Sequence, residues 1–253
     1  MAAALVAASG VAYALSVQCD GTNDQDPDPG QCRGTNQNDV IIGTAQRDII
    51  FALAGFDQVS SLGGQDVLNG GSNADTLAGG NDNDTYNGAG GPDFLDEFQD
   101  TTVSGNDVMN GGGGTDFIQG NDGNDILRGQ EGDDSQSGAF FTAMFGDPGD
   151  DELRGGPGDD AMEGEEGTDQ HFGGDDNDFI DAVNDDEVGT HDLVDCGSGN
   201  DTAIVREPED IVRGNCEDVT EVSTIAADTG APDGEEQQQQ AAEAFLQEHG
   251  MQP

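Results

Sequence analysis

Apolar residues recur along this chain every nine positions, and each of them follows an aspartate by two residues. Glycine and small or polar residues fill most of the remaining positions. A short fixed period of this kind predicts a repeat architecture, in which every unit contributes one inward-facing side chain. The inward positions are Ile41, Ile50, Val59, Leu68, Leu77, Tyr86, Leu95, Met109, Ile118, Leu127, Leu153, Met162 and Ile180. Three units carry Gln136, His171 or Ala203 there instead, and we expect looser coils at those points.

The aspartates keep the same nine-residue period in three runs. The runs are Asp39, Asp48, Asp57, Asp66, Asp75, Asp84 and Asp93; then Asp107, Asp116, Asp125 and Asp134; then Asp151, Asp160, Asp169 and Asp178, with Asp201 alone after a gap. Two residues before each aspartate the chain has Gly, Asn or Asp, except for Gln37 and Gln46 in the first two units. These three residue types tolerate positive φ, so the pattern predicts a tight turn before each aspartate.

The clearest units are residues 111–119, 120–128 and 155–163, which follow the pattern G-G-x-G-x-D-x-U-x, where U is apolar. This pattern resembles the calcium-binding repeat of the RTX (haemolysin-type) proteins, and the resemblance covers about residues 34–205 with interruptions. It implies an all-β fold, a parallel β-roll or calcium-binding β-solenoid, in which six residues of each unit turn and three form a short strand.

In such a roll two units complete one coil, so turns eighteen residues apart stack on one edge. Ca²⁺ takes six to eight oxygen ligands, and stacked turns offer glycine carbonyls and two aspartates. We expect about nine calcium sites. The stacked pairs without an interruption are 39/57, 48/66, 57/75, 66/84, 75/93, 107/125, 116/134, 151/169 and 160/178. The first coils are expected to bind weakly, because Arg47 adjoins Asp48 and Ala52-Leu53 replace the glycines before Asp57.

A disordered Gly/Asp-rich tract is the alternative to the roll, since this composition normally favours disorder. Such a tract would not place an apolar residue two positions after nearly every periodic aspartate.

The charge balance is 54 acidic against 6 basic residues, a net charge of −48. This charge opposes compaction, and only 32% of the residues are hydrophobic. We therefore expect metal binding to supply much of the folding free energy. The acidity argues against nucleic acid, whose phosphates need a basic patch, and against anionic membranes.

The N-terminal segment 1–14 is apolar and uncharged, and Ala12-Tyr13-Ala14 fits a signal-peptide cleavage site. We therefore expect a secreted, extracellular protein.

Four cysteines flank the array, Cys19 and Cys32 before it and Cys196 and Cys216 near its end. Four cysteines allow three disulfide connectivities. We favour 19–32 and 196–216, because local pairs need no long-range return of the chain. Zinc is the rival reading, but neither pair has C-x-x-C spacing. The pairs would close an N-terminal cap at 15–33 and a C-terminal cap at 206–222.

Three interruptions break the period, near 96–104, 137–145 and 181–195, and add five, eight and fourteen residues. The second contains Phe140, Phe141 and Phe145, which would form either a partner-binding patch or a loop folded over a weak coil. Residues 223–253 read as a flexible acidic, Gln-rich tail with at most a frayed helix at 235–249.

Neither H-E-x-x-H nor G-x-S-x-G occurs, so we expect no catalysis. The leading hypothesis is a secreted, non-catalytic calcium-binding β-roll whose folding depends on calcium. One alternative is a calcium-rigidified adhesion or matrix protein with an extracellular partner. Another is a diverged fragment of an RTX enzyme.

Overall fold

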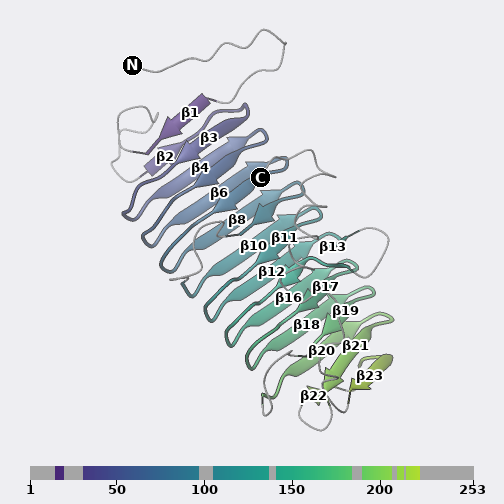
Figure 1. Cartoon of the computed structure of the whole chain (residues 1–253). Helices are drawn as coiled ribbons and strands as arrows, with labels where there is room; N and C mark the ends of the chain where they lie inside the picture. The colour runs from purple at the N-terminus through teal and green to yellow at the C-terminus, as the bar shows by residue number, and fades with distance from the viewer. Residues whose placement is uncertain are drawn as a thin grey trace, which may run out of the picture.

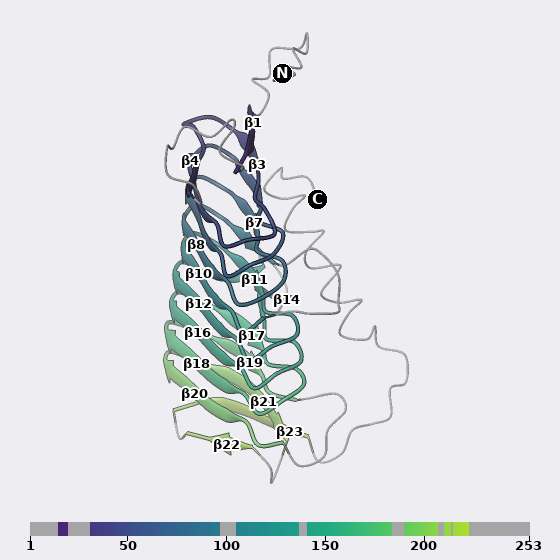
Figure 2. The ribbon, with the colours of Figure 1, turned by 90° about the vertical axis from the view of Figure 1, so that its left-hand side faces the viewer.

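The structure is a computed structural model that describes residues 15–19, 31–96, 105–136, 141–183, 190–206, 210–213 and 215–222. Within these ranges every regular element is a β-strand, and two parallel sheets face each other to form a roll (Figure 1). Coils stack from the N-terminal end to the C-terminal end, and a side view separates the two sheets (Figure 2). The prediction of an all-β parallel β-roll is confirmed. The expected signal segment and the tail lie outside the described residues.

The first sheet, here called the long-strand sheet, has ten strands, most of them six residues long. They are β2 (Gln31–Arg33), β4 (Ile49–Ala54), β6 (Val67–Ser72), β8 (Thr85–Gly90), β10 (Val108–Gly113), β12 (Ile126–Glu131), β16 (Glu152–Pro157), β18 (Gln170–Asp175), β20 (Leu193–Ser198) and β22 (Ile211–Val212).

The second sheet, the short-strand sheet, has eleven strands. They are β1 (Leu15–Gln18), β3 (Asp39–Ile42), β5 (Gln58–Ser60), β7 (Thr76–Ala78), β9 (Phe94–Leu95), β11 (Phe117–Gln119), β15 (Met144–Phe145), β17 (Ala161–Glu163), β19 (Phe179–Asp181), β21 (Thr202–Arg206) and β23 (Asp218–Val222). Along the array the chain alternates between the sheets, so two units make one coil as expected. Strand length alternates too, and the three-residue strand implied by the resemblance holds for only one sheet.

The core consists of two facing columns of side chains between the sheets, one column from each sheet. Tyr86, for example, pairs in register with Leu68 on one side and Met109 on the other. All thirteen predicted inward residues are at most 1% exposed. His171 and Ala203 take the same position and are also fully buried. The nine-residue apolar pattern therefore identified the core correctly.

At the second interruption the chain leaves the roll after Asp134 and forms a small antiparallel hairpin, β13 (Ser135–Gln136) with β14 (Phe141–Thr142). It then re-enters the short-strand sheet as β15, where Met144 pairs with Ile118 and Met162 and is fully buried. Met144 thus takes the inward position that the pattern assigned to Gln136. The expectation of a loose coil at Gln136 is corrected, because the insertion supplies a substitute strand.

The three phenylalanines of this interruption have different positions. Phe145 is 3% exposed and packs on Phe117, whose ring stacks on Phe94 with centroids 4.7 Å apart. Phe140 lies outside the described residues, and Phe141 is described only in its backbone. Phe145 therefore belongs to a buried satellite cluster on the short-strand sheet and not to an exposed patch.

The third interruption is shorter than the spacing indicated. Strand β20 begins at Leu193 and pairs with β18 through Val194 and His171, so residues 192–195 belong to a coil. Asp192 takes the periodic position, and the inserted length between Asp178 and Asp192 is five residues beyond the nine-residue period. The expected interruption to residue 195 is corrected accordingly.

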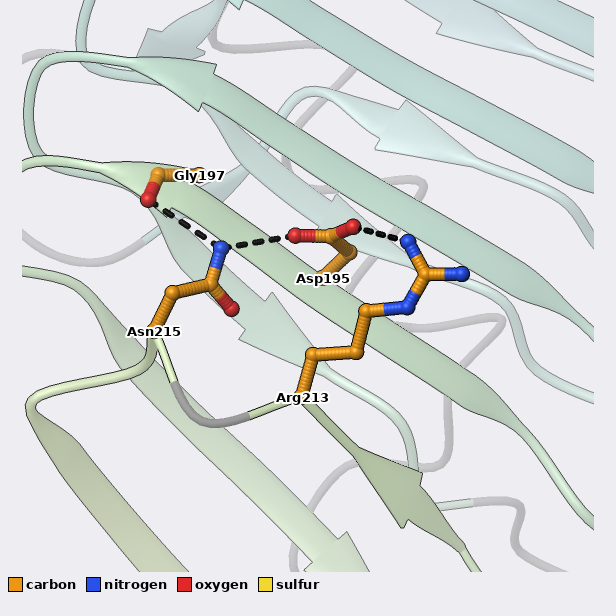
Figure 3. Close-up of polar contacts among 4 residues, drawn as sticks. All are labelled: Asp195, Gly197, Arg213 and Asn215. Carbon is orange, nitrogen blue, oxygen red and sulfur yellow. Dashed lines mark hydrogen bonds and ion pairs between the residues drawn. The ribbon is translucent and has the colours of Figure 1, made fainter.

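Both predicted disulfides are present, Cys19–Cys32 and Cys196–Cys216. The C-terminal end is held further by Asn215, whose Nδ2 donates to Asp195 Oδ1 at 2.7 Å and to the Gly197 carbonyl at 3.1 Å (Figure 3). Arg213 forms an ion pair with the same carboxylate. Each end of the roll is therefore covalently closed, as a solenoid end requires. The described segments include no helix with the length and apolar character to cross a membrane.

Candidate metal centre

A ladder of buried aspartates runs along the turns of the roll. From Asp39 to Asp178 the backbone N–H of each periodic aspartate donates to Oδ1 of the aspartate one coil further on, as from Asp48 to Asp66 at 2.6 Å and from Asp66 to Asp84 at 2.7 Å, and Asp201 donates to Glu217 Oε2. All nine predicted stacked pairs are joined in this way. The fifteen predicted ligand residues, from Asp39 to Asp178, are each at most 3% exposed. The 18-residue stacking prediction therefore holds throughout.

The ladder also crosses every interruption. The additional bonds join Asp84 to Asp107, Asp93 to Asp116, Asp125 to Asp151, Asp134 to Asp160, Asp169 to Asp192, Asp178 to Asp201 and Asp192 to Asp210. Insertions are thus looped out without breaking the stack, and nine is an undercount of the stacked pairs. Asp192 and Asp210 were missed by the spacing. The available signal was the apolar Val194, two residues after Asp192.

The second carboxylate oxygen of the interior aspartates is buried and accepts no hydrogen bond. In the described part of the chain this holds for Oδ2 of Asp57, Asp66, Asp75, Asp84, Asp93, Asp107, Asp116, Asp125, Asp134, Asp151, Asp160, Asp169, Asp178 and Asp201. A buried charged oxygen without a partner is costly, and a regular row of them requires a compensating cation.

Beside most orphan oxygens the space is kept open by a glycine five residues before the aspartate, whereas Ala52, Ser61 and Cys196 stand there before Asp57, Asp66 and Asp201. A Cβ on Gly70 would lie 2.6 Å from Asp75 Oδ2 and 3.0 Å from the Gly88 carbonyl oxygen. The next coil repeats this arrangement, because a Cβ on Gly88 would lie 2.4 Å from Asp93 Oδ2 and 2.5 Å from the Gly111 carbonyl oxygen. A carboxylate and a carbonyl therefore converge on one small space in every such turn.

These oxygens fit a calcium ion, which prefers carboxylate and carbonyl ligands. No group of three or more His, Cys, Asp or Glu side chains in the described ranges is arranged to hold a metal by itself. Backbone carbonyls that lie beside the carboxylates, such as that of Gly88 beside Asp75, would complete the ligand set of an ion in these turns.

The electrostatics of the ladder point the same way. Burial raises the pKa of Asp66 to about 6, of Asp75 to about 8 and of Asp160 to about 9, and neighbouring ladder carboxylates add to the rise for all three. Without a cation the folded ladder would therefore retain protons near neutral pH. A bound divalent ion provides the positive charge that lets the carboxylates ionise.

The ends of the ladder are built differently from its interior. Thr35 donates from its backbone N and Oγ1 to Asp39 Oδ2, at 2.6 and 3.0 Å, and Thr44 does the same to Asp48 at 2.7 and 3.0 Å. At the other end the backbone N of Arg206 donates to Asp210 Oδ2 at 2.6 Å. At both ends, therefore, protein groups donate hydrogen bonds to the aspartate Oδ2 atom, which has no hydrogen-bond partner in the interior coils. Weak calcium binding in the first coils remains a prediction. Its structural reason is that Thr35 and Thr44 already occupy the carboxylate oxygens of Asp39 and Asp48.

An aspartate ladder beside glycine-lined oxygen cradles, on the edge of a parallel roll, defines a calcium-binding β-roll. The chain belongs to the RTX calcium-binding nonapeptide repeat family, which matches it in four copies at residues 33–59, 60–95, 101–135 and 145–180, more than half of its length. Calcium is accordingly the ion that these repeats bind. A comparison with curated proteins gave no match.

Proposed function

We propose that this chain is a secreted, non-catalytic calcium-binding β-roll protein, and that calcium between its stacked turns drives its folding. The observation that carries the proposal is the row of fourteen buried Oδ2 atoms without a hydrogen-bond partner, counted over the described residues. Calcium ions bound in the cradles would supply the missing partner of these oxygens.

The energetics support a dependence on calcium. Folding costs roughly 1–2 kcal/mol of backbone entropy per residue. The core that opposes this cost is narrow, with one inward side chain from each sheet in every coil, and the net charge of −48 adds self-repulsion. Metal binding that occurs only in the folded state adds its free energy directly to folding.

Secretion and the lack of catalysis are supported by separate features. Disulfides persist in oxidising compartments, and both cysteine pairs here are bonded. His171 is fully buried in the core, where burial lowers its pKa to about 4, so it is unsuited to acid–base catalysis at neutral pH. The sequence carries no zinc-protease or serine-hydrolase motif.

The test is a calcium titration of metal-depleted protein, followed by far-UV circular dichroism. We expect a disordered spectrum in chelator and a β-spectrum with millimolar calcium. Magnesium should substitute poorly, because it demands a smaller octahedral site and keeps its waters. A β-rich spectrum in chelator at neutral pH would overturn the proposal.

A further inference from the structure

The outer face of the long-strand sheet carries four of the six basic residues of the chain. Side chains three residues after each periodic position point outward and stand in register from strand to strand, forming what we call the arginine row. The row contains Arg33, Phe51, Asn69, Asn87, Asn110, Arg128, Arg154, Phe172 and Asp195, and Arg213 continues it. The other two basic residues, Arg47 and Arg206, lie elsewhere.

A second outward row runs beside it, two residues earlier in each strand. Its members are Gln31, Ile49, Val67, Thr85, Val108, Ile126, Glu152, Gln170, Leu193 and Ile211. The two rows hold four arginines and only two acidic residues, Glu152 and Asp195. In a chain with 54 acidic residues, these two rows are the exception in charge, and the exposed Glu131 and Asp175 stand outside them at the ends of β12 and β18.

The long-strand sheet forms one side of the roll, at the left of Figure 2, and none of the other described strands lies over its outer face. The small hairpin β13–β14 packs near β17 of the opposite sheet. Parallel sheets are normally covered on both faces, yet Phe51 is 36% exposed and the Arg154 side chain 44% exposed. Ten strands at about 4.8 Å spacing make the platform about 43 Å long.

Specific contacts hold Arg128 and Arg154 in place on this face. Arg128 and Arg154 are register partners on adjacent strands, an arrangement of like charges that is destabilising by itself. Arg128 donates to Asn110 Oδ1 at 3.4 Å, while Arg154 bonds Glu152 at 2.7 Å and lies 4.2 Å over the Phe172 ring. These contacts fix two neighbouring guanidinium groups at the surface.

We propose that this face docks a linear polysaccharide whose sugars carry carboxylates. Guanidinium groups bind carboxylates in a two-pronged geometry. The partly exposed amides of Asn69 and Asn87 offer hydrogen bonds to hydroxyl groups. Phe51 and the apolar members of the second row offer a flat surface for sugar rings. A sparsely charged chain fits best, because the −48 charge of the protein repels a polymer as dense in charge as nucleic acid.

The test uses the folded full-length protein in calcium with immobilised hyaluronan, a linear polysaccharide with a carboxylate on every second sugar. We expect binding to hyaluronan, no binding to neutral dextran, and weaker binding to the densely charged heparin. R128Q/R154Q should lose at least fivefold in affinity. Arg47→Gln is the matched control, because it removes an exposed arginine outside this face, and it should stay within twofold.

Circular dichroism in calcium first confirms that each variant is folded, so that a folding defect is not read as lost binding. The proposal is overturned by no binding to hyaluronan, by equal binding to dextran, by heparin binding more tightly than hyaluronan, or by equal losses in the R128Q/R154Q and R47Q proteins. It needs only the folded roll, so a failure here leaves calcium-dependent folding untouched.

Discussion

At the scale of single residues, the decisive contrast lies between aspartates whose second oxygen is orphaned and those whose second oxygen has a protein donor. Asp66 and Asp48 are stacked on each other and share the same ladder geometry. Only Asp48 receives the hydroxyl and backbone N of a threonine, Thr44. Substitutions at these two positions therefore separate the contribution of the bound ion to stability from that of the ladder hydrogen bonds.

We predict that Asp66→Asn raises the calcium concentration at the folding midpoint by roughly twofold or more, because a carboxylate ligand is lost from an interior cradle. Asp48→Asn should have a much smaller effect, since Thr44 already pairs the corresponding oxygen. Both variants are compared by calcium-titrated circular dichroism at one ionic strength. Equal shifts would show that the end coil binds calcium as the interior does.

Backbone strain appears at a turn position that the pattern did not single out. In most units the second residue adopts positive φ as well as the fourth, and Leu62 stands at the second position with φ 79° and 42% of its surface exposed. A bulky residue in this conformation costs roughly 1–2 kcal/mol. Gly80, at the equivalent position of the next coil, has φ +92° and lies close to the Leu62 carbonyl.

Leu62→Gly should therefore stabilise the calcium-bound roll by about 0.5–1 kcal/mol after the greater flexibility of glycine in the unfolded chain is subtracted. Gly80→Ala should destabilise it, because its Cβ would lie 2.2 Å from the Leu62 carbonyl oxygen. Thermal melts at saturating calcium measure both. A lower melting temperature for Leu62→Gly would mean that the leucine packs usefully where it lies.

At the scale of elements, each coil is a replaceable unit that tolerates insertions at its turns. The ladder continues past five- and eight-residue insertions without a missing hydrogen bond. The second insertion goes further, because it replaces the strand that should follow Asp134 with β15. The packing between coils therefore requires that some strand continue the stack, and that strand need not be the one that the nine-residue period predicts.

Met144→Ala should lower the stability of the roll by about 2–5 kcal/mol, the usual cost of truncating a buried methionine. Gln136→Ala should change it little, because Met144 fills the inward position between Ile118 and Met162. Chemical denaturation in saturating calcium distinguishes the two. A large loss of stability in Gln136→Ala would contradict this assignment, because it would show that Gln136 and not Met144 contributes to the core.

At the scale of the whole molecule, protons and calcium compete for one set of buried carboxylates. In the metal-free roll burial raises the pKa of Asp75 to about 8 and of Asp93 to about 9, above the unfolded value of about 4. Folding therefore takes up protons. The stabilisation by protons is full below about pH 4 and is lost as the pH rises through 8 to 9. His171 acts in the opposite direction, but it is one group among many carboxyls.

We predict that in chelator the chain gains β-structure as the pH is lowered from 8 to 5, because protons replace calcium on the ladder. Measurements stop at pH 5, above the isoelectric point near 4.1, to avoid precipitation. In saturating calcium the spectrum should change much less over this range. A metal-free chain that becomes more disordered on acidification would contradict the buried, proton-retaining ladder.

The sequence alone determined the repeat, its 18-residue coil, the inward column and the ladder aspartates, because each rests on a local periodicity that one coil imposes on the next. It also favoured the two disulfides that are observed, Cys19–Cys32 and Cys196–Cys216. These features survive because stacking in a solenoid depends only on neighbouring coils.

Only the tertiary structure decided which residues fill the stack where the spacing is broken. Met144 replaces Gln136, and Asp192 carries the ladder across the third interruption, because hydrogen bonding between coils selects whatever segment can reach the next strand. The threonine-closed first turns and the arginine row also emerged only in three dimensions. Each depends on which residues of successive coils lie side by side, and insertions of different length hide that alignment in the linear sequence.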